Sequence, residues 1–303
     1  FMSAPMSDAF LVLAQAKGGL TCFLMPRFTP DGAVNRIHFQ RLKSTLGSRS
    51  NASSEVEFAE ANAVAIGEEG EGTRVIIEMV TETRLDCAVA SAGLMRQALA
   101  HALHHAAHRT AFQKKLIDQP LMQSVLADMA LDVEAATALV FRLARAFDTP
   151  NDPIDDAWRR LMTPVVKYWV CKTAPPLVAE AMECLGGNGY VEAGPLARIY
   201  REVPVNSIWE GSGNIMALDA VRVLRRDPET AGYVLASLEV AARQDALTRA
   251  LHDRLAALAG DAAHLEANAR LIAEGLALLA AAVLLQKDGP REIAEAFIAQ
   301  RLT

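Results

Sequence analysis

The pattern of hydrophobic and polar positions changes near residue 73. Before that point, short apolar runs alternate with turn residues. Two of them, AFLVLAQA at 9–16 and LTCFLMPRF at 20–28, flank a Lys-Gly-Gly connection that is typical of a hairpin. The later runs IHFQRL and SSEVEFAEANAVAIG keep a partial alternation, as expected of a small sheet with one covered face. The beginning of the chain is therefore predicted to form strands.

From about Thr73 onward, Ala and Leu dominate, and apolar residues recur three and four positions apart. This period is that of an amphipathic or buried helix, and helix breakers are widely spaced. Helices are predicted over 73–108, 119–148, 154–185, 214–225, 229–259, 262–286 and 290–301. Long helices with short connections pack antiparallel. The predicted fold class is α+β, mostly α, with an up-and-down helical bundle.

Composition narrows the class of protein. A chain of 303 residues buries enough apolar surface to fold without disulfides or a metal. The four cysteines lie far apart and form no C-x-x-C pair, which argues for a reduced, cytoplasmic protein and against a zinc module. Positive and negative charges are interspersed, with a net charge of −6, so no basic stripe indicates nucleic acid.

Neither a membrane span nor a secretory signal is expected. The longest apolar run, about 276–285, is too short to cross a bilayer, and Glu274 stands just before it. The chain begins at Phe1 with neither an initiator Met nor a charged leader region. We therefore expect it to be part of a longer polypeptide.

The segment NSIWEGSGNIM at 206–216 carries the strongest chemical signal. A helix that begins near Asn214 leaves its first N–H groups unpaired, and glycines on either side of Ser212 let a ligand approach the backbone. Such a helix start suits a pyrophosphate or a polarised carbonyl. Glu210, next to Trp209, would be partly desolvated and so usable as a general base. The simpler alternative is an ordinary helix start capped by Ser212.

Two further segments hold candidate binding residues. CLGGNGY at 184–190 ends a helix at Gly186, the expected C-cap, and its two further glycines suggest close approach of a ligand to the backbone. Arg109 ends the first long helix, where its planar charge could reach a phosphate or simply complement the helix dipole. The histidines just before it share one helical face, but no Asp, Glu or Cys accompanies them at ligand spacing, so no metal site is predicted.

In this order and spacing, the motifs resemble the acyl-CoA dehydrogenase family. The resemblance rests on LGSRSNASSEVEF, TRLDCAVASAGLMRQAL, HRTAFQKKL, VLADMAL, ECLGGNGY and YREVPVNSIWEGSGNIM, and it extends from Phe1 to about Leu224. Within the family, the residues of these motifs are most similar to those of the AidB-type branch. The implied domains are the C-terminal half of the middle β-domain at 1–72, a four-helix bundle at 73–226 and a helical extension at 227–303.

The resemblance also implies an activity. In enzymes of this family, a glutamate removes the α-proton of an acyl-CoA thioester while the β-hydride passes to FAD. Glu210 occupies the place of that glutamate. The other positions carried over are Arg109, Phe112, Gly186, Gly187, Ser212 and Asn214 for FAD, and Arg84 for the CoA portion of the substrate. Gln113, Pro120 and Glu183 depart from the family pattern. The expected partners are an electron acceptor and further copies of the chain, as a dimer of dimers.

An alternative function comes from the AidB-type branch itself. It is a flavoprotein that associates with DNA in the alkylation response and has little dehydrogenase activity. Residues 225–303, where that branch carries a DNA-associated extension, hold nine Lys or Arg against eleven Asp or Glu. Phosphate binding normally needs a net basic surface, so the charge balance disfavours strong DNA affinity.

Overall fold

The change from a strand-like to a helix-like apolar pattern near residue 73 coincides with the start of the first long helix, at Gly72. The computed structural model describes residues 1–149, 151–261 and 263–303, which form two compact units, Phe1–Thr83 and Arg84–Thr303. The domain boundaries inferred from the sequence stay predictions. The first compact unit nevertheless extends about three turns into the first long helix. The second unit is not divided at the predicted domain boundary between residues 226 and 227.

The first unit contains the strands that the apolar runs predict. Three of them form an antiparallel sheet in the order β1-β2-β5, and β3 pairs with β4 in a separate two-stranded sheet. Their bounds are β1 (Ala9–Ala16), β2 (Gly19–Pro26), β3 (Ile37–Leu42), β4 (Ser54–Phe58) and β5 (Val64–Ile66), with a short 3₁₀ turn η1 at Ala4–Met6. A small core of Ala4, Phe10, Val12 and Met25 holds this unit together.

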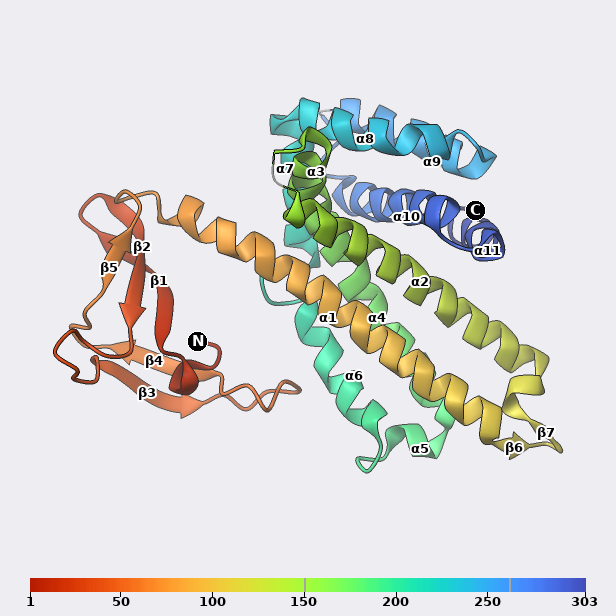
Figure 1. Ribbon diagram of the computed structural model, residues 1–303, viewed down its shortest axis with the longest axis horizontal. Helices are drawn as coiled ribbons and strands as arrows, with labels where there is room; N and C mark the ends of the chain where they lie inside the picture. Colours follow the sequence, from red (N-terminus) through yellow and green to blue (C-terminus); the bar gives the residue numbers. More distant parts are fainter. Residues whose placement is uncertain (150, 262) are drawn as a thin grey trace. The chain divides into compact units, whose positions relative to one another are not determined.

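The second unit is helical and starts within α1 (Figure 1). Its helices are α1 (Gly72–His108), α2 (Pro120–Asp148), α3 (Pro153–Ala157), α4 (Thr163–Leu185), α5 (Gly187–Tyr190), α6 (Pro195–Asn206), α7 (Gly213–Arg226), α8 (Pro228–Ala242), α9 (Ala246–Gly260), α10 (Ala269–Asp288) and α11 (Arg291–Arg301). A hairpin of β6 (Thr110–Ala111) and β7 (Lys114–Lys115) and a 3₁₀ turn η2 (Leu116–Asp118) link α1 to α2. The predicted fold class is confirmed.

Three details of the helix prediction are wrong. Residues 195–206 form α6, with Pro195 in its first turn, although no helix was predicted there. The predicted helix 229–259 is two helices, because the Asp245 side chain accepts hydrogen bonds from the backbone N–H groups of Leu247 and Thr248 and so caps a new start. A π-helical turn η3 (Trp158–Met162) lies within the predicted helix 154–185.

The predicted helix 262–286 begins later than expected. Ala262 lies outside the described residues, and α10 starts at Ala269. This helix is almost wholly apolar and packs against α2, α4 and α7. By length and composition it could cross a membrane, but 67% of its most apolar window is buried within the protein. Its burial therefore explains its composition as that of a core helix.

The core of the helical unit yields a stability prediction. Phe297 on α11 is 0% exposed, whereas Phe141 on α2 is 72% exposed. Phe297→Ala removes a filled position in the core and should destabilise the unit by about 3–5 kcal/mol. Phe141→Ala, the matched control, should stay within about 0.5 kcal/mol. Guanidinium denaturation followed by circular dichroism measures both, and equal effects of the two changes would contradict the packing described.

Candidate functional site

The segment between α6 and α7 is a short loop of unusual backbone conformation. We call Trp209–Ser212 the Glu210 loop. Glu210 has φ of 56° and Gly211 has φ of 104°, so two consecutive residues occupy the left-handed region. For a residue with a side chain this conformation costs about 1–2 kcal/mol and persists only where surrounding contacts impose it. The contacts at Glu210 and Gly211 therefore decide where the carboxylate lies.

Arg84, on α1, binds the backbone carbonyl of Glu210. Its Nε donates a hydrogen bond to the Glu210 backbone oxygen at 3.0 Å. Its Nη1 forms an ion pair with the Asp219 carboxylate of α7 at 2.7 Å, and the two side chains are only 13% and 23% exposed. A guanidinium fixed by a partly buried carboxylate is an oriented donor. The structure thus brings Arg84 together with Glu210, while its predicted contact with CoA stays a prediction.

Lys167, on α4, holds the next carbonyl. Its Nζ donates to the Gly211 backbone oxygen at 2.8 Å, although the residue is only 1% exposed. Burial lowers the pKa of this lysine, while the nearby Glu210 carboxylate acts in the opposite direction. Two cationic side chains from different helices therefore bind two consecutive carbonyl oxygens.

Two buried thiols lie beside Lys167. The Cys171 thiol donates to the Cys87 backbone oxygen at 3.4 Å and accepts from the Ser91 hydroxyl at 3.4 Å. Burial raises the pKa of Cys171 to about 11 and raises that of Cys87 as well. Both thiols therefore stay protonated near neutral pH, and all four cysteines of the chain are free.

The Glu210 side chain is less restrained than the Glu210 backbone. The residue is half-buried next to Trp209, whose indole N–H donates to the Asn206 side-chain oxygen at 3.1 Å. Among the described residues, no hydrogen bond or ion pair engages the Glu210 carboxylate. The backbone is therefore restrained from two sides while the carboxylate remains available to an external proton donor.

Ser212 and Asn214, predicted to contact the flavin, lie at the start of α7 and are exposed. Ser212 occupies the N-cap position, but its side chain makes no capping hydrogen bond; only its backbone oxygen accepts, from Met216 N–H at 2.9 Å. Side-chain capping, the simpler explanation for this serine, does not occur. In the described part of the chain, no side chain accepts a hydrogen bond from the first N–H groups of α7.

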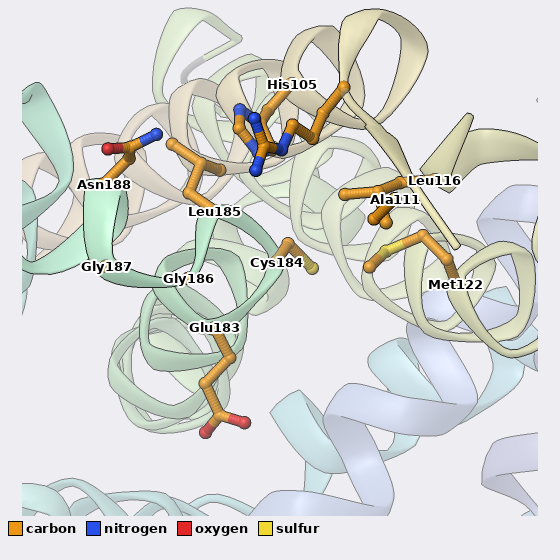
Figure 2. Close-up of a pocket in the computed structure, with 11 residues that line it drawn as sticks. His105, Ala111, Leu116, Met122, Glu183, Cys184, Leu185, Gly186, Gly187 and Asn188 are labelled. Carbon is orange, nitrogen blue, oxygen red and sulfur yellow. The ribbon is translucent and has the colours of Figure 1, made fainter. Parts of the chain in front are cut away.

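A second candidate site is a cavity of about 450 Å³ between the C-terminal end of α1 and the end of α4. Figure 2 shows His105, Leu185 and Asn188 around it, with Glu183 directed away from His105. Three predicted FAD residues line this cavity together: Arg109, Gly186 and Gly187. Sequence positions almost eighty apart are thereby brought to one place.

The glycines at the cavity have different roles. Gly186 has φ of 60° and ψ of −140°, a conformation open only to glycine, and it ends α4. A Cβ on Gly186 or Gly187 would meet no atom within 4 Å. A Cβ on Gly189, by contrast, would clash with the Met182 backbone oxygen. Gly189 is therefore needed for packing, whereas Gly187 leaves open space.

Two titratable groups line the cavity without having been predicted from the sequence. Burial, with a smaller contribution from the Arg109 charge, lowers the pKa of His105. Burial raises the pKa of Cys184 to about 11. The imidazole is therefore neutral near pH 7 and the thiol is protonated, so Arg109 supplies the positive charge on this side of the cavity.

Phe112 lies outside both sites. It forms, with Gln113, the two-residue turn of the β6–β7 hairpin, and its side chain is 92% exposed. Both residues have positive φ, 52° and 67°, which is the conformation of a turn that favours Asn and Gly. The departure at Gln113 therefore places a long side chain where glycine is easier to accommodate.

Two histidines of α1 contact each other. The His104 and His108 rings lie 4.4 Å apart between centroids, and His108 Nδ1 contacts the His104 backbone oxygen at 2.8 Å. Among the residues the structure describes, no group of three or more His, Cys, Asp or Glu side chains gathers as metal ligands would.

Lys167 and Asp219 were missed from the sequence. A lysine amid the apolar run TPVVKYWVC was the available signal for Lys167, because a buried charge requires a partner. Asp219 gave no signal, since an aspartate on an amphipathic helix ordinarily faces solvent.

Comparisons with known proteins agree on one family. A family model described as the acyl-CoA dehydrogenase C-terminal domain matches residues 70–224. The chain is 56% identical to “Putative acyl-CoA dehydrogenase AidB” of Escherichia coli K12 over 75% of this chain and 42% of that protein. It is 34% identical to acyl-CoA dehydrogenase family member 11 of Caenorhabditis elegans over 74% of this chain and 38% of that protein. The chain thus spans less than half of these two relatives.

Solved structures share the fold. Caenorhabditis elegans ACDH-11 in complex with C11-CoA superposes with a TM-score of 0.88 at 27% identity, covering 97% of this chain and 56% of that one. A Bacillus anthracis acyl-CoA dehydrogenase complexed with FAD gives a TM-score of 0.80, covering 98% of this chain and 59% of that one. At 18% identity the second likeness shows the fold alone.

The two glycines at the cavity separate packing from ligand access. Gly189→Ala forces a Cβ against the α4 backbone and should destabilise the helical unit by about 1–3 kcal/mol. Gly187→Ala meets no atom and should change the free energy of unfolding by less than about 1 kcal/mol. Thermal melting of the ligand-free protein measures both, and a larger loss in Gly187→Ala would contradict the geometry.

Proposed function

Since the chain belongs to the acyl-CoA dehydrogenase family, we propose that it takes part in the FAD-dependent α,β-dehydrogenation of an acyl-CoA thioester, with Glu210 as the base. One observation carries the proposal. The Glu210 backbone is fixed by Arg84 and, through Gly211, by Lys167, while no described residue binds its carboxylate. A restrained, unpaired and half-buried carboxylate is suited to accept a proton from a bound substrate.

Glu210 performs the proton transfer in this scheme. Its carboxylate takes the α-proton, the electron pair of that C–H bond becomes part of the new Cα=Cβ bond, and the β-carbon loses a hydride. FAD, when bound, supplies the acceptor of the hydride, so the acyl chain is oxidised and the flavin reduced. Protonated Glu210 returns its proton to solvent after the enoyl product leaves, and an external electron acceptor must reoxidise the flavin.

The residues around the cavity at the end of α4 fit the nucleotide part of FAD. Arg109 offers a permanent positive charge to a pyrophosphate, and Gly186 and Gly187 leave open space where a ligand can approach the backbone. Ser212 and Asn214 are exposed at the start of α7, where unpaired N–H groups suit a polar ligand edge. These residues would hold the cofactor, and Arg84 is proposed to serve the CoA side.

We further propose that the active assembly is a homo-oligomer, a dimer of dimers, located in the cytoplasm. Phe112 supports the association, because a phenylalanine that is 92% exposed at a hairpin tip gains from burial against another copy. In this assembly Phe112 and Arg109 of one subunit would contact the FAD bound by its neighbour. DNA association, the alternative from the AidB-type branch, gains no support from the acidic balance of residues 225–303.

The base is tested by Glu210→Gln in the flavin-loaded protein. The amide keeps the shape of the side chain but cannot accept the α-proton. The rate of flavin reduction by acyl-CoA should therefore fall about 10²- to 10⁴-fold. Anaerobic absorption spectra recorded after mixing with thioesters of several chain lengths measure that rate.

The matched control is Glu274→Gln, an exposed glutamate on α10. It should reduce flavin at the unaltered rate, since it contacts neither candidate site. An unaltered rate in Glu210→Gln would refute the role of Glu210. Flavin bands that persist in the unmodified protein with every thioester would refute the dehydrogenase function.

A further inference from the structure

A lysine that is 1% exposed stands in an otherwise apolar part of α4. Its neighbours Val165, Val166 and Val170 are each 0% exposed. Desolvating an ammonium is unfavourable, and an apolar side chain of similar length would fill the same space at lower cost. Packing alone therefore does not explain this residue.

The hydrogen bond of Lys167 identifies what the charge does. Among the described residues, its hydrogen-bond acceptor is the Gly211 backbone oxygen, at 2.8 Å from Nζ. Gly211 has φ of 104° and no side chain that could resist reorientation of the peptide plane that follows it. Without an external donor this carbonyl could turn away, and the preceding residue, Glu210, would lose its fixed direction.

Arg84 does not replace Lys167 in this role. The guanidinium binds the carbonyl of Glu210, one peptide unit earlier, and is itself fixed by Asp219. Each of the two carbonyls therefore has its own donor, from α1 and α4 respectively. Restraining both peptide units is what keeps two consecutive residues in the left-handed region.

We infer that Lys167 is a positioning residue for Glu210: its ammonium, through the Gly211 carbonyl, fixes the backbone that presents the carboxylate to the substrate. The inference rests on the proposed function. The same charge also interacts electrostatically with Glu210, and the other titratable or charged groups that face it are Arg84 and Cys87 of α1 and Cys171 of α4.

The test compares three variants of the flavin-loaded protein. Lys167→Met removes the donor and its charge, Lys167→Arg keeps both, and Lys287→Met removes an exposed lysine at the end of α10 as the control. In Lys167→Met we expect kcat to fall about 10- to 100-fold with KM within about threefold, because a displaced base slows only the chemical step. Lys167→Arg should recover at least part of kcat, and Lys287→Met should match the unmodified protein.

A further readout separates positioning from a merely structural role. Hydrogen exchange should rise in peptides that cover 207–216 but not in those of α10. In Lys167→Arg, which keeps the donor, the exchange of 207–216 should stay near that of the unmodified protein.

The outcomes separate this inference from the proposed function. Unchanged kcat with unchanged exchange in 207–216, or uniform loss of protection throughout the helical unit without rescue by arginine, would overturn the positioning role. If no thioester reduces the flavin of the unmodified protein, the proposed function fails. The exchange of 207–216 in Lys167→Met and Lys167→Arg then still decides whether Lys167 fixes the loop.

Discussion

The candidate active site depends on one electrostatic constraint: two cationic side chains from separate helices hold two consecutive backbone carbonyls. Arg84 binds the carbonyl of Glu210, and Lys167 binds that of Gly211. Both cations are largely withdrawn from water, where hydrogen bonds to charged donors are strong and directional. A left-handed glutamate in a loop would otherwise relax, so these bonds set the direction of the carboxylate.

The rest of the helical unit supports that constraint. Helix α1 carries Arg84, α4 carries Lys167, and α7 carries the Asp219 that orients Arg84. The apolar helix α10 packs against α4, which carries Lys167, and against α7, which follows the loop. The C-terminal ends of the same two helices, α1 and α4, supply Arg109 and the glycine turn that line the cavity of the second candidate site. One set of helices therefore positions both candidate sites.

Local patterns predicted most of the fold. The apolar alternation marked the strands, and the 3.6-residue period marked the long helices. Linked motifs supplied Glu210, Arg109 and Gly186 as candidate site residues, and their roles stay predictions. Tertiary effects were not predictable in this way. The sequence could not show that Arg84 turns to the Glu210 carbonyl or that the isolated Lys167 has the next carbonyl as its partner, because both contacts join distant segments.

A crystal structure of the flavin-loaded protein with an unreactive thioether analogue of an acyl-CoA tests the central claim most directly. The account predicts a Glu210 carboxylate oxygen within about 3–3.5 Å of the carbon equivalent to Cα, with the Glu210 and Gly211 carbonyls still bound by Arg84 and Lys167. A carboxylate turned to solvent, or another side chain at that carbon, would contradict it.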